Sequence, residues 1–257
     1  MAQSMLAATS KGTHMRTSFI SLTGVALLWA AGAMGASTEK LKVLLVTGDD
    51  VKAHDWREMA EATKDVLAAG KFEVDMREGL SVFDSADNLK GFDLIFLSYF
   101  NAKATLSDQA RANLLNFVKG GKGLALSHLS SACFADWDEF RKMVGRYWVF
   151  KKSGHGPRSV FTARIADRDH PITKGAQDFQ VDDELYAKLE GDAPIHVLVT
   201  ADSDWSKRTE PLAFTLAYGQ GRVFHEAFGH DGKAIKTPGV AELIRRGCEW
   251  AATGKVD

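Results

Sequence analysis

The sequence contains little cysteine, little proline and almost no net charge. Its 257 residues include two cysteines and five prolines, and the formal net charge is −1. A near-neutral chain gives no indication of a nucleic-acid or acidic-membrane partner, because such partners are recognised by a positive surface. With 45% hydrophobic and 25% charged residues, the composition is that of an ordinary globular protein.

Several short motifs of catalysis and nucleotide binding are also missing. The chain has no G-x-S-x-G or G-x-C-x-G elbow, no H-E-x-x-H, no Walker A sequence and no G-x-G-x-x-G. No nucleotide cofactor is therefore predicted, and the sequence gives little support for a serine or cysteine nucleophile. The two cysteines, Cys133 and Cys248, could pair in an oxidising compartment. Cys248 lies on the apolar stripe of the last expected helix, which favours a buried free thiol instead.

The N-terminus resembles a secretory signal peptide in all three of its parts. Arg16 supplies the charge, an apolar run covers residues 19–31, and Ala33-Met34-Gly35-Ala36 is a small-residue cleavage zone. We expect Met15 to be the true start, residues 1–36 to be extension and signal, and the mature protein to be periplasmic or secreted. The alternative is a single N-terminal anchor, although the apolar run is short for a membrane span.

The first half of the mature chain alternates buried strands with amphipathic helices. Apolar strands are expected at 41–46, 72–76, 94–97 and 123–127, with helices from Trp56 to Gly70 and from Ser107 to Gly120. The second half is richer in strands, expected at 160–165, 195–199, 212–216 and 222–228, before a final helix over 240–251. Because this alternation is typical of a doubly wound parallel sheet, we predict a single α/β domain over residues 40–253.

Polar side chains gather where the expected strands end, which is where open α/β sheets bind ligands. The candidates for chemistry are His54, His128, His155, Asp183, Glu184 and His230. His128 ends the fourth strand, at the corner where a nucleophile would stand in a nucleophile elbow. Neutral imidazole serves as a general base or as a metal ligand. We therefore predict acid–base residues among His54, His128, Asp183, Glu184 and His230.

A divalent metal, Zn²⁺ first, is also predicted at this edge. The expected ligands are His54, His128, His155 and His230, because imidazoles from separate loops could converge there and leave an open position. Adjacent strand residues point to opposite faces, so only one of Asp183 and Glu184 is expected to join them. Each residue could also have a purely structural role, because loop histidines are often solvated and strand-end carboxylates often bind loop amides. His170, His196 and His225 are expected to be structural.

An ordered series of segments resembles the trehalose-utilisation (ThuA-like) family. The segments are LLVTGDDVKAHDW, FDLIFLS, FVKGGKGLALSHLSSA, DHPITKG, DDELY, PLAF and YGQGRVFHEAFGH. The resemblance implies a class I glutamine amidotransferase-like, flavodoxin-like sandwich with a mostly parallel central sheet, without the catalytic cysteine and without glutaminase activity. It maps the family's recurrent polar positions onto His54, His128, Asp183, Glu184, Tyr186 and His230. The chain departs from the family at 145–148, where Gly-Arg-Tyr-Trp replaces Gly-Gly-x-Phe.

Two functions follow as hypotheses. The first is an exported lyase, hydrolase or isomerase acting on a keto-sugar, disaccharide or glycoside. The second is a non-catalytic sugar-binding module on the same scaffold. In either case the partner is a small carbohydrate, with Trp56, Tyr99 and Tyr186 as expected substrate-binding residues. Tyr147, Trp148 and Trp205 are further stacking candidates. Neither nucleic acid nor, after signal cleavage, a membrane is expected, and the sequence leaves the oligomeric state open.

Overall fold

The computed structural model describes residues 40–49, 54–101 and 103–257, so the expected signal segment and start site lie outside the described residues. Within them, the strands are β1 (Leu41–Gly48), β2 (Phe72–Glu78), β3 (Leu94–Tyr99), β4 (Gly123–Ser127), β5 (Ser159–Ile165), β6 (Phe179–Asp183), β7 (His196–Ser203), β8 (Arg208–Tyr218) and β9 (Gly221–Glu226). The α-helices are α1 (Trp56–Ala68), α2 (Asp108–Lys119), α3 (Asp138–Val144), α4 (Gly232–Ile235) and α5 (Pro238–Thr253). The 3₁₀ turns are η1 (Ser81–Asp84), η2 (Ala86–Leu89) and η3 (His128–Ala132).

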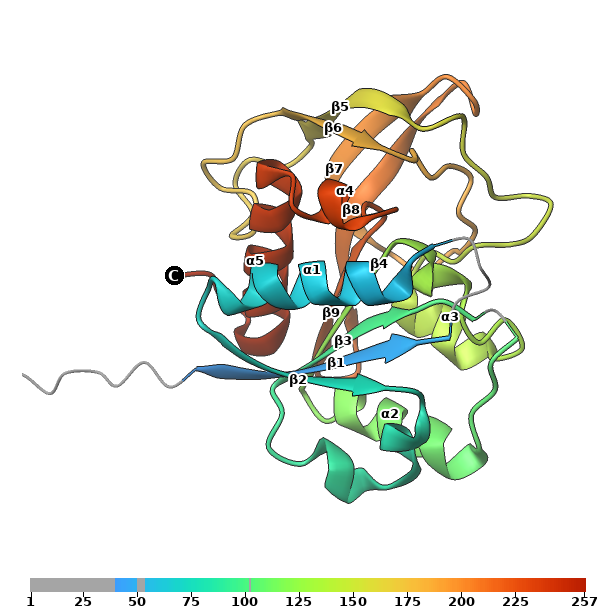
Figure 1. Ribbon diagram of the computed structural model, residues 1–257, viewed down its shortest axis with the longest axis vertical. Coiled ribbons are helices and arrows are strands. Elements are labelled where there is room, and N and C mark those ends of the chain that lie inside the picture. The colour runs from blue at the N-terminus through green and yellow to red at the C-terminus, as the bar shows by residue number, and fades with distance from the viewer. Residues whose placement is uncertain (1–39, 50–53, 102) are drawn as a thin grey trace, which may run out of the picture. The chain divides into compact units, whose positions relative to one another are not determined.

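The described strands form one sheet in the order β2-β1-β3-β4-β9-β8-β7-β5-β6 (Figure 1). The first half is parallel: β1 pairs with β2 and β3, β3 with β4, and β4 with β9. Every residue of β3 and β4 is buried, because apolar clusters cover both faces of this half. The near-continuous apolar runs had predicted this. The expected α/β class and single domain architecture are confirmed.

The second half of the sheet is antiparallel through β9, β8, β7, β5 and β6. The sheet is therefore mixed, with four parallel and four antiparallel pairings. The sequence analysis missed β6, whose five residues FQVDD carry two carboxylates and too short an alternation to be recognised. It also missed the seven-residue α3, which has no side-chain cap to mark its start.

The two cysteines lie in separate apolar clusters on opposite faces of the sheet. Cys133 packs in the cluster that contains Leu114 and Phe140, and Cys248 in the cluster with Leu67 and Ile244. Both thiols are free and buried, as the hydrophobic stripe of α5 had favoured.

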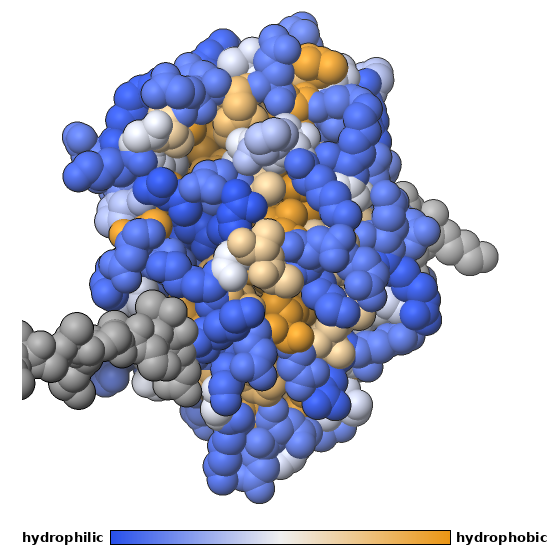
Figure 2. Space-filling model, turned by 60° about the vertical axis from the view of Figure 1, so that its left-hand side comes forward, coloured by the Kyte–Doolittle hydropathy of each residue, from blue (hydrophilic) through white to orange (hydrophobic). Residues whose placement is uncertain are grey.

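No helix in the described part of the chain is long and apolar enough to span a membrane. Figure 2 shows a mostly hydrophilic face on which hydrophobic residues are visible in narrow strips between polar side chains.

Candidate functional site

The strand-end corner at His128 has an unusual backbone. His128 has a φ of 47°, a left-handed conformation that side chains other than glycine rarely adopt. It closes β4 and opens η3, so the chain turns sharply from strand to helix at this residue. This is the geometry of a nucleophile elbow with an imidazole at its corner.

The imidazole of His128 is held from two sides. Its Nδ1 lies 3.0 Å from the carbonyl oxygen of Ala227, and its ring stacks on Tyr186 with centroids 4.0 Å apart. Because a carbonyl only accepts, Nδ1 carries the proton and Nε2 presents its lone pair to the site. His128 is completely buried. The loops after β6 and β9 cover this strand end with Tyr186 and Ala227.

One carboxylate oxygen, Oε2 of Glu184, joins three histidines. It lies 3.1 Å from Nδ1 of His230, 3.5 Å from Nε2 of His155 and 3.6 Å from Nε2 of His128. Burial opposes ionisation of Glu184, but its electrostatic interactions with the imidazoles of His128, His155 and His230 outweigh burial. Together they lower the pKa of Glu184 to about 2. Glu184 is thus an anion set among imidazoles.

His54 completes the cluster from the loop before α1. Its ring centroid lies 5.1 Å from that of His128 and 4.8 Å from that of His230, and it stacks on Phe100 at 5.4 Å. Burial, followed by repulsion from the protonated forms of His128 and His230, lowers the pKa of His54 to about 3. His54 is therefore neutral near pH 7, the protonation state that a metal ligand or a general base needs.

Four side chains form a group that could hold a metal ion. His54, His128, Glu184 and His230 each offer one ligand atom, and these atoms lie within 4.8 Å of one another. Zinc–ligand bonds of about 2.0–2.2 Å place tetrahedral ligands roughly 3.4 Å apart, so small side-chain movements would close the group. The predicted ligand set contained His155 in place of Glu184. In the structure His155 lies behind this carboxylate, with Nδ1 2.7 Å from the carbonyl oxygen of Gly156.

Asp183 faces away from this group and holds the backbone around it. Its carboxylate accepts hydrogen bonds from the amides of Glu184 (2.9 Å), Gly229 (2.7 Å) and His230 (3.0 Å), and its side chain is fully buried. Asp183 therefore positions two members of the cluster, while its neighbour Glu184 enters the cluster. This is the division of roles that opposite strand faces had predicted.

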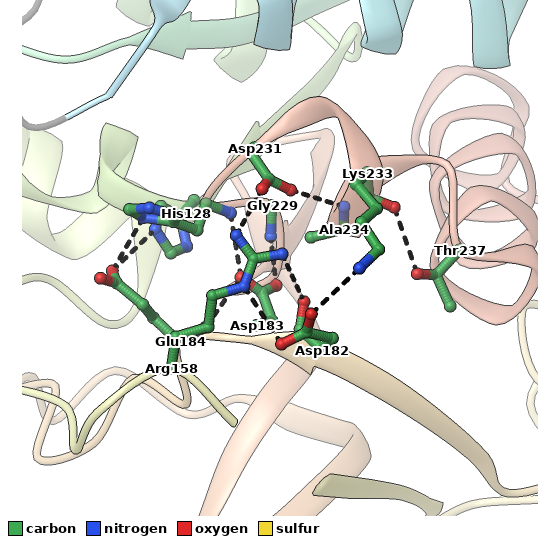
Figure 3. A network of polar contacts seen from close by, with 11 residues as sticks. His128, Arg158, Asp182, Asp183, Glu184, Gly229, Asp231, Lys233, Ala234 and Thr237 are labelled. Carbon is green, nitrogen blue, oxygen red and sulfur yellow. Dashed lines mark hydrogen bonds and ion pairs between the residues drawn. The ribbon is translucent and has the colours of Figure 1, made fainter. Parts of the chain in front are cut away.

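An ion-pair network also joins the segments that carry Glu184 and His230 (Figure 3). Arg158 bonds through Nε to Asp182 (3.1 Å) and through Nη1 to Asp231, and Lys233 reaches Asp182 at 3.2 Å. Asp231 also caps α4 by accepting from the amide of Ala234 at 2.8 Å. Arg158 was not among the predicted site residues, because its partners lie 24 and 73 residues away in the chain.

Of the three expected substrate-binding residues, Tyr186 and Tyr99 are buried and Trp56 begins a helix. Tyr186 stacks on His128, but it is almost fully buried, and burial raises its pKa. Tyr99 is also buried, and its hydroxyl donates to Asp49 at 3.2 Å. Burial and the Asp49 charge raise the pKa of Tyr99 to about 12. Trp56 opens α1, with the Arg57 guanidinium 4.2 Å from its ring centroid.

Cys133 does not stand at the elbow. Its thiol donates to the carbonyl oxygen of Tyr99 at 2.6 Å, and burial raises its pKa to about 12. A thiol this hard to ionise is a poor nucleophile.

The fold and the cluster define a class: an α/β protein with an imidazole–carboxylate site at the carboxyl edge of its parallel strands. The family model for trehalose utilisation (ThuA) matches residues 42–251, and the chain belongs to this family. Membership links it to carbohydrate utilisation, as the ordered motifs had predicted. A comparison with curated proteins found no match.

Solved structures agree with the family. A ThuA-like protein from Parabacteroides merdae ATCC 43184 is similar at 28% identity and a TM-score of 0.75, over 84% of this chain and 91% of that one. A ThuA-like protein from Bacteroides uniformis ATCC 8492 is 16% identical at a TM-score of 0.67, over 87% and 97%. A glutamine amidotransferase from Thermotoga maritima is matched at 12% identity and a TM-score of 0.45, over 73% and 74%.

Proposed function

We propose that this chain is an enzyme that acts on a disaccharide or glycoside carrying a keto group, by acid–base chemistry at the cluster of His54, His128, Glu184 and His230. The observation that carries the proposal is the convergence of three imidazoles and one carboxylate, from four separate segments, at the ligand-binding edge of the sheet. Family membership supports carbohydrate as the substrate class.

The proposed reaction is an elimination. A keto group acidifies the neighbouring C–H, and Nε2 of His128, whose other nitrogen is tied to Ala227, is the base that removes this proton. The C–O bond at the next carbon then breaks, and the leaving oxygen takes a proton from a second imidazole, His230. The Glu184 carboxylate lies 3.1 Å from His230 Nδ1 and orients that ring.

As the alternative to base catalysis by His128, we propose that the four cluster residues bind a divalent metal, Zn²⁺ first. Nδ1 of His128 is tied to Ala227, so its Nε2 would then be a metal ligand rather than the base. Imidazole nitrogens and a carboxylate oxygen are ligands that zinc accepts. The lowered pKa of His54 keeps its imidazole neutral, the form that binds a metal. When bound, such a metal would act as a Lewis acid that stabilises negative charge on the keto oxygen.

The test is turnover of a 3-keto-disaccharide by the wild type, His128→Asn and His196→Asn. His196 is a matched control, because it is an exposed histidine at the amino end of β7. We expect His128→Asn to lose about 10²–10⁴-fold in rate, the usual contribution of a general acid or base. Equal rates in all three folded proteins would refute the proposal.

The sugar-binding module is retained as the second function, because aromatic rings line the cluster. Trp148 lies 4.7 Å from Tyr186 and 6.2 Å from His155, so the site could hold a ring without reacting with it. Sugar binding that His128→Asn weakens, with no turnover by the wild type, would favour the module.

Export is also proposed, on the charged, apolar and small-residue parts of residues 15–36. N-terminal sequencing of protein from the periplasm should give a start near Ala36 or Ser37. A mature form that retains Met15 would contradict cleavage.

A further inference from the structure

We infer that a second pocket, beside the cluster and walled by Trp205, binds the second pyranose ring of a disaccharide. This inference rests on the proposed function, because it assigns the first ring to the histidine–glutamate cluster. The pocket has a volume of about 380 Å³, within the range of small-molecule sites. Its lining residues used below are Ser159, Val160, Leu185, Asp202, Ser203 and Trp205.

The pocket exists because two neighbouring strands separate. β5 and β7 pair only at Arg164↔Thr200 and Ile165↔Val199, and beyond these pairs they diverge toward Ser159 and Ser203. β6 occupies the far side of β5, and β8 the far side of β7. Half of the backbone N–H and C=O groups of the diverging ends therefore face the gap, where they can bond to sugar hydroxyls.

The open end of this gap lies at the same edge of the sheet as the cluster. β8 is antiparallel to β9 and β7 is antiparallel to β8, so β7 runs parallel to β9. The carboxyl end of β7 at Ser203 thus lies on the edge where β4 ends at His128. The chain neighbours agree, because the lining residues Gly156 and Leu185 directly follow His155 and Glu184.

Trp205 also packs directly on the loop that carries His155. A Cβ on Gly154 would approach within 2.7 Å of the Trp205 ring, and one on Gly156 within 3.5 Å of its Cβ. Two mutual hydrogen bonds between Gly154 and Ala187, at 2.8 and 3.2 Å, hold the same loop from the other side. A ligand against Trp205 therefore contacts the segment from which His155 reaches Glu184.

The chemistry of the lining suits a sugar ring. A pyranose has C–H faces that pack on aromatic surface and hydroxyls that need fixed polar partners. Trp205 is 43% exposed, and the carboxylate of Asp202 is fixed by Arg164 and Thr209, each at 2.6 Å.

The experiment compares one-ring and two-ring sugars by calorimetric titration, with glucose and trehalose as probes. We expect Trp205→Ala to weaken trehalose binding about three- to tenfold, the scale of one aromatic contact, and to leave glucose binding unchanged. Trp205→Phe should retain most of the affinity. Phe150→Ala, at an aromatic residue 59% exposed and outside the pocket lining, is the matched control.

A second variant guards against misfolding of Trp205→Ala. Val160 is 62% exposed at the rim, so Val160→Arg should fold and should reduce trehalose binding by filling the pocket. Equal affinity for trehalose in wild type and both variants would overturn the inference, as would an equal loss for glucose and trehalose.

The two proposals fail separately. Turnover that depends on His128, together with trehalose binding that is indifferent to Trp205 and Val160, removes the second-ring pocket alone. Trehalose binding that depends on Trp205, without turnover of any keto-disaccharide, supports the pocket and removes the proposed reaction.

Discussion

Two groups of histidines lie at opposite edges of the same sheet and differ in burial and in their charged neighbours. His54, His128 and His230 meet at the carboxyl ends of the parallel strands, around the Glu184 anion. His170 and His196 lie at the other edge, with ring centroids 5.2 Å apart, and Nε2 of His196 is 2.7 Å from Asp167. The His196 side chain is 55% exposed, whereas that of His128 is fully buried.

The two groups therefore differ in burial and in their neighbours, although their side chains are of one type. Burial and neighbouring imidazoles lower the pKa of His54 to about 3, and the loops hold its neighbours in fixed orientations. At the other edge water solvates the imidazole of His196, and its partner carboxylate, Asp167, is only partly buried. An ion pair of this kind contributes little to stability or chemistry.

The largest expected effect separates the two groups by activity. His230→Gln removes an imidazole from the cluster, and we expect sugar turnover to fall by about 10²-fold or more. His170→Gln should leave the rate within about twofold, because His170 lies at the other edge. Rates are to be compared on proteins of equal folded fraction. Similar losses in both variants would show that the comparison is wrong.

A smaller effect concerns the carboxylates that serve each group. Asp183→Ala leaves one buried and two partly buried amides without an acceptor, so we expect a loss of about 3 kcal/mol in the free energy of unfolding. Asp167→Ala removes a partly buried carboxylate that accepts from His196 and from the amides of Asp169 and His170. It should cost less stability than Asp183→Ala, because this turn is more exposed to water. Urea unfolding of both variants provides the measurement. An Asp183→Ala protein as stable as the wild type would mean that the cluster does not depend on this support.

The smallest expected effect is a change in pH dependence. Glu226 is fully buried at the end of β9, and burial, together with the nearby Asp183 charge, raises its pKa well above the usual value despite the Phe228 amide. The unfolded chain loses this proton near pH 4.5, whereas the folded protein keeps it. The contribution of Glu226 to stability is therefore complete below about pH 4.5 and is lost as the pH rises.

Glu226→Gln removes this titration. Between pH 5 and 8 the free energy of unfolding of the wild type should fall by up to about 1.4 kcal/mol per pH unit, because the folded state keeps the Glu226 proton and the unfolded state loses it. The variant should not show this part of the fall. Thermal melts across this range measure the slope. Glu73→Gln, at an exposed position, is the control. Parallel slopes for wild type and Glu226→Gln would contradict a raised pKa.

The parallel half of the fold could be predicted because each of its strands is a local signal. Runs such as those of β3 and β4 are apolar throughout, and caps at Ser107 and glycines at 120–121 mark the helix that joins them. The antiparallel half depends on pairings between segments that are far apart in the chain. β6 and the divergence of β5 from β7 have no local signature, so the second pocket was beyond sequence reasoning.

The cluster itself was predictable in part. Strand ends located His54, His128 and His230, because the carboxyl ends of parallel strands share one edge. The sequence predicted His155 as the fourth ligand, whereas the structure groups Glu184 with the other three histidines. That choice depends on how the 155 loop packs on Trp205 and on which way Asp183 and Glu184 point. The export signal and the enzymatic reaction remain predictions.

The most direct test of the account is the metal content of three proteins after gel filtration: wild type, Glu184→Gln and His155→Gln. Elemental analysis should find about one divalent ion per chain in the wild type and in His155→Gln, and a loss of about tenfold or more in Glu184→Gln. His155→Gln is the matched control, because its imidazole contacts the same carboxylate without belonging to the four-residue group. Metal that survives Glu184→Gln but is lost in His155→Gln would contradict the assigned site. A metal-free wild type whose sugar turnover is unchanged by chelation would contradict the metal altogether.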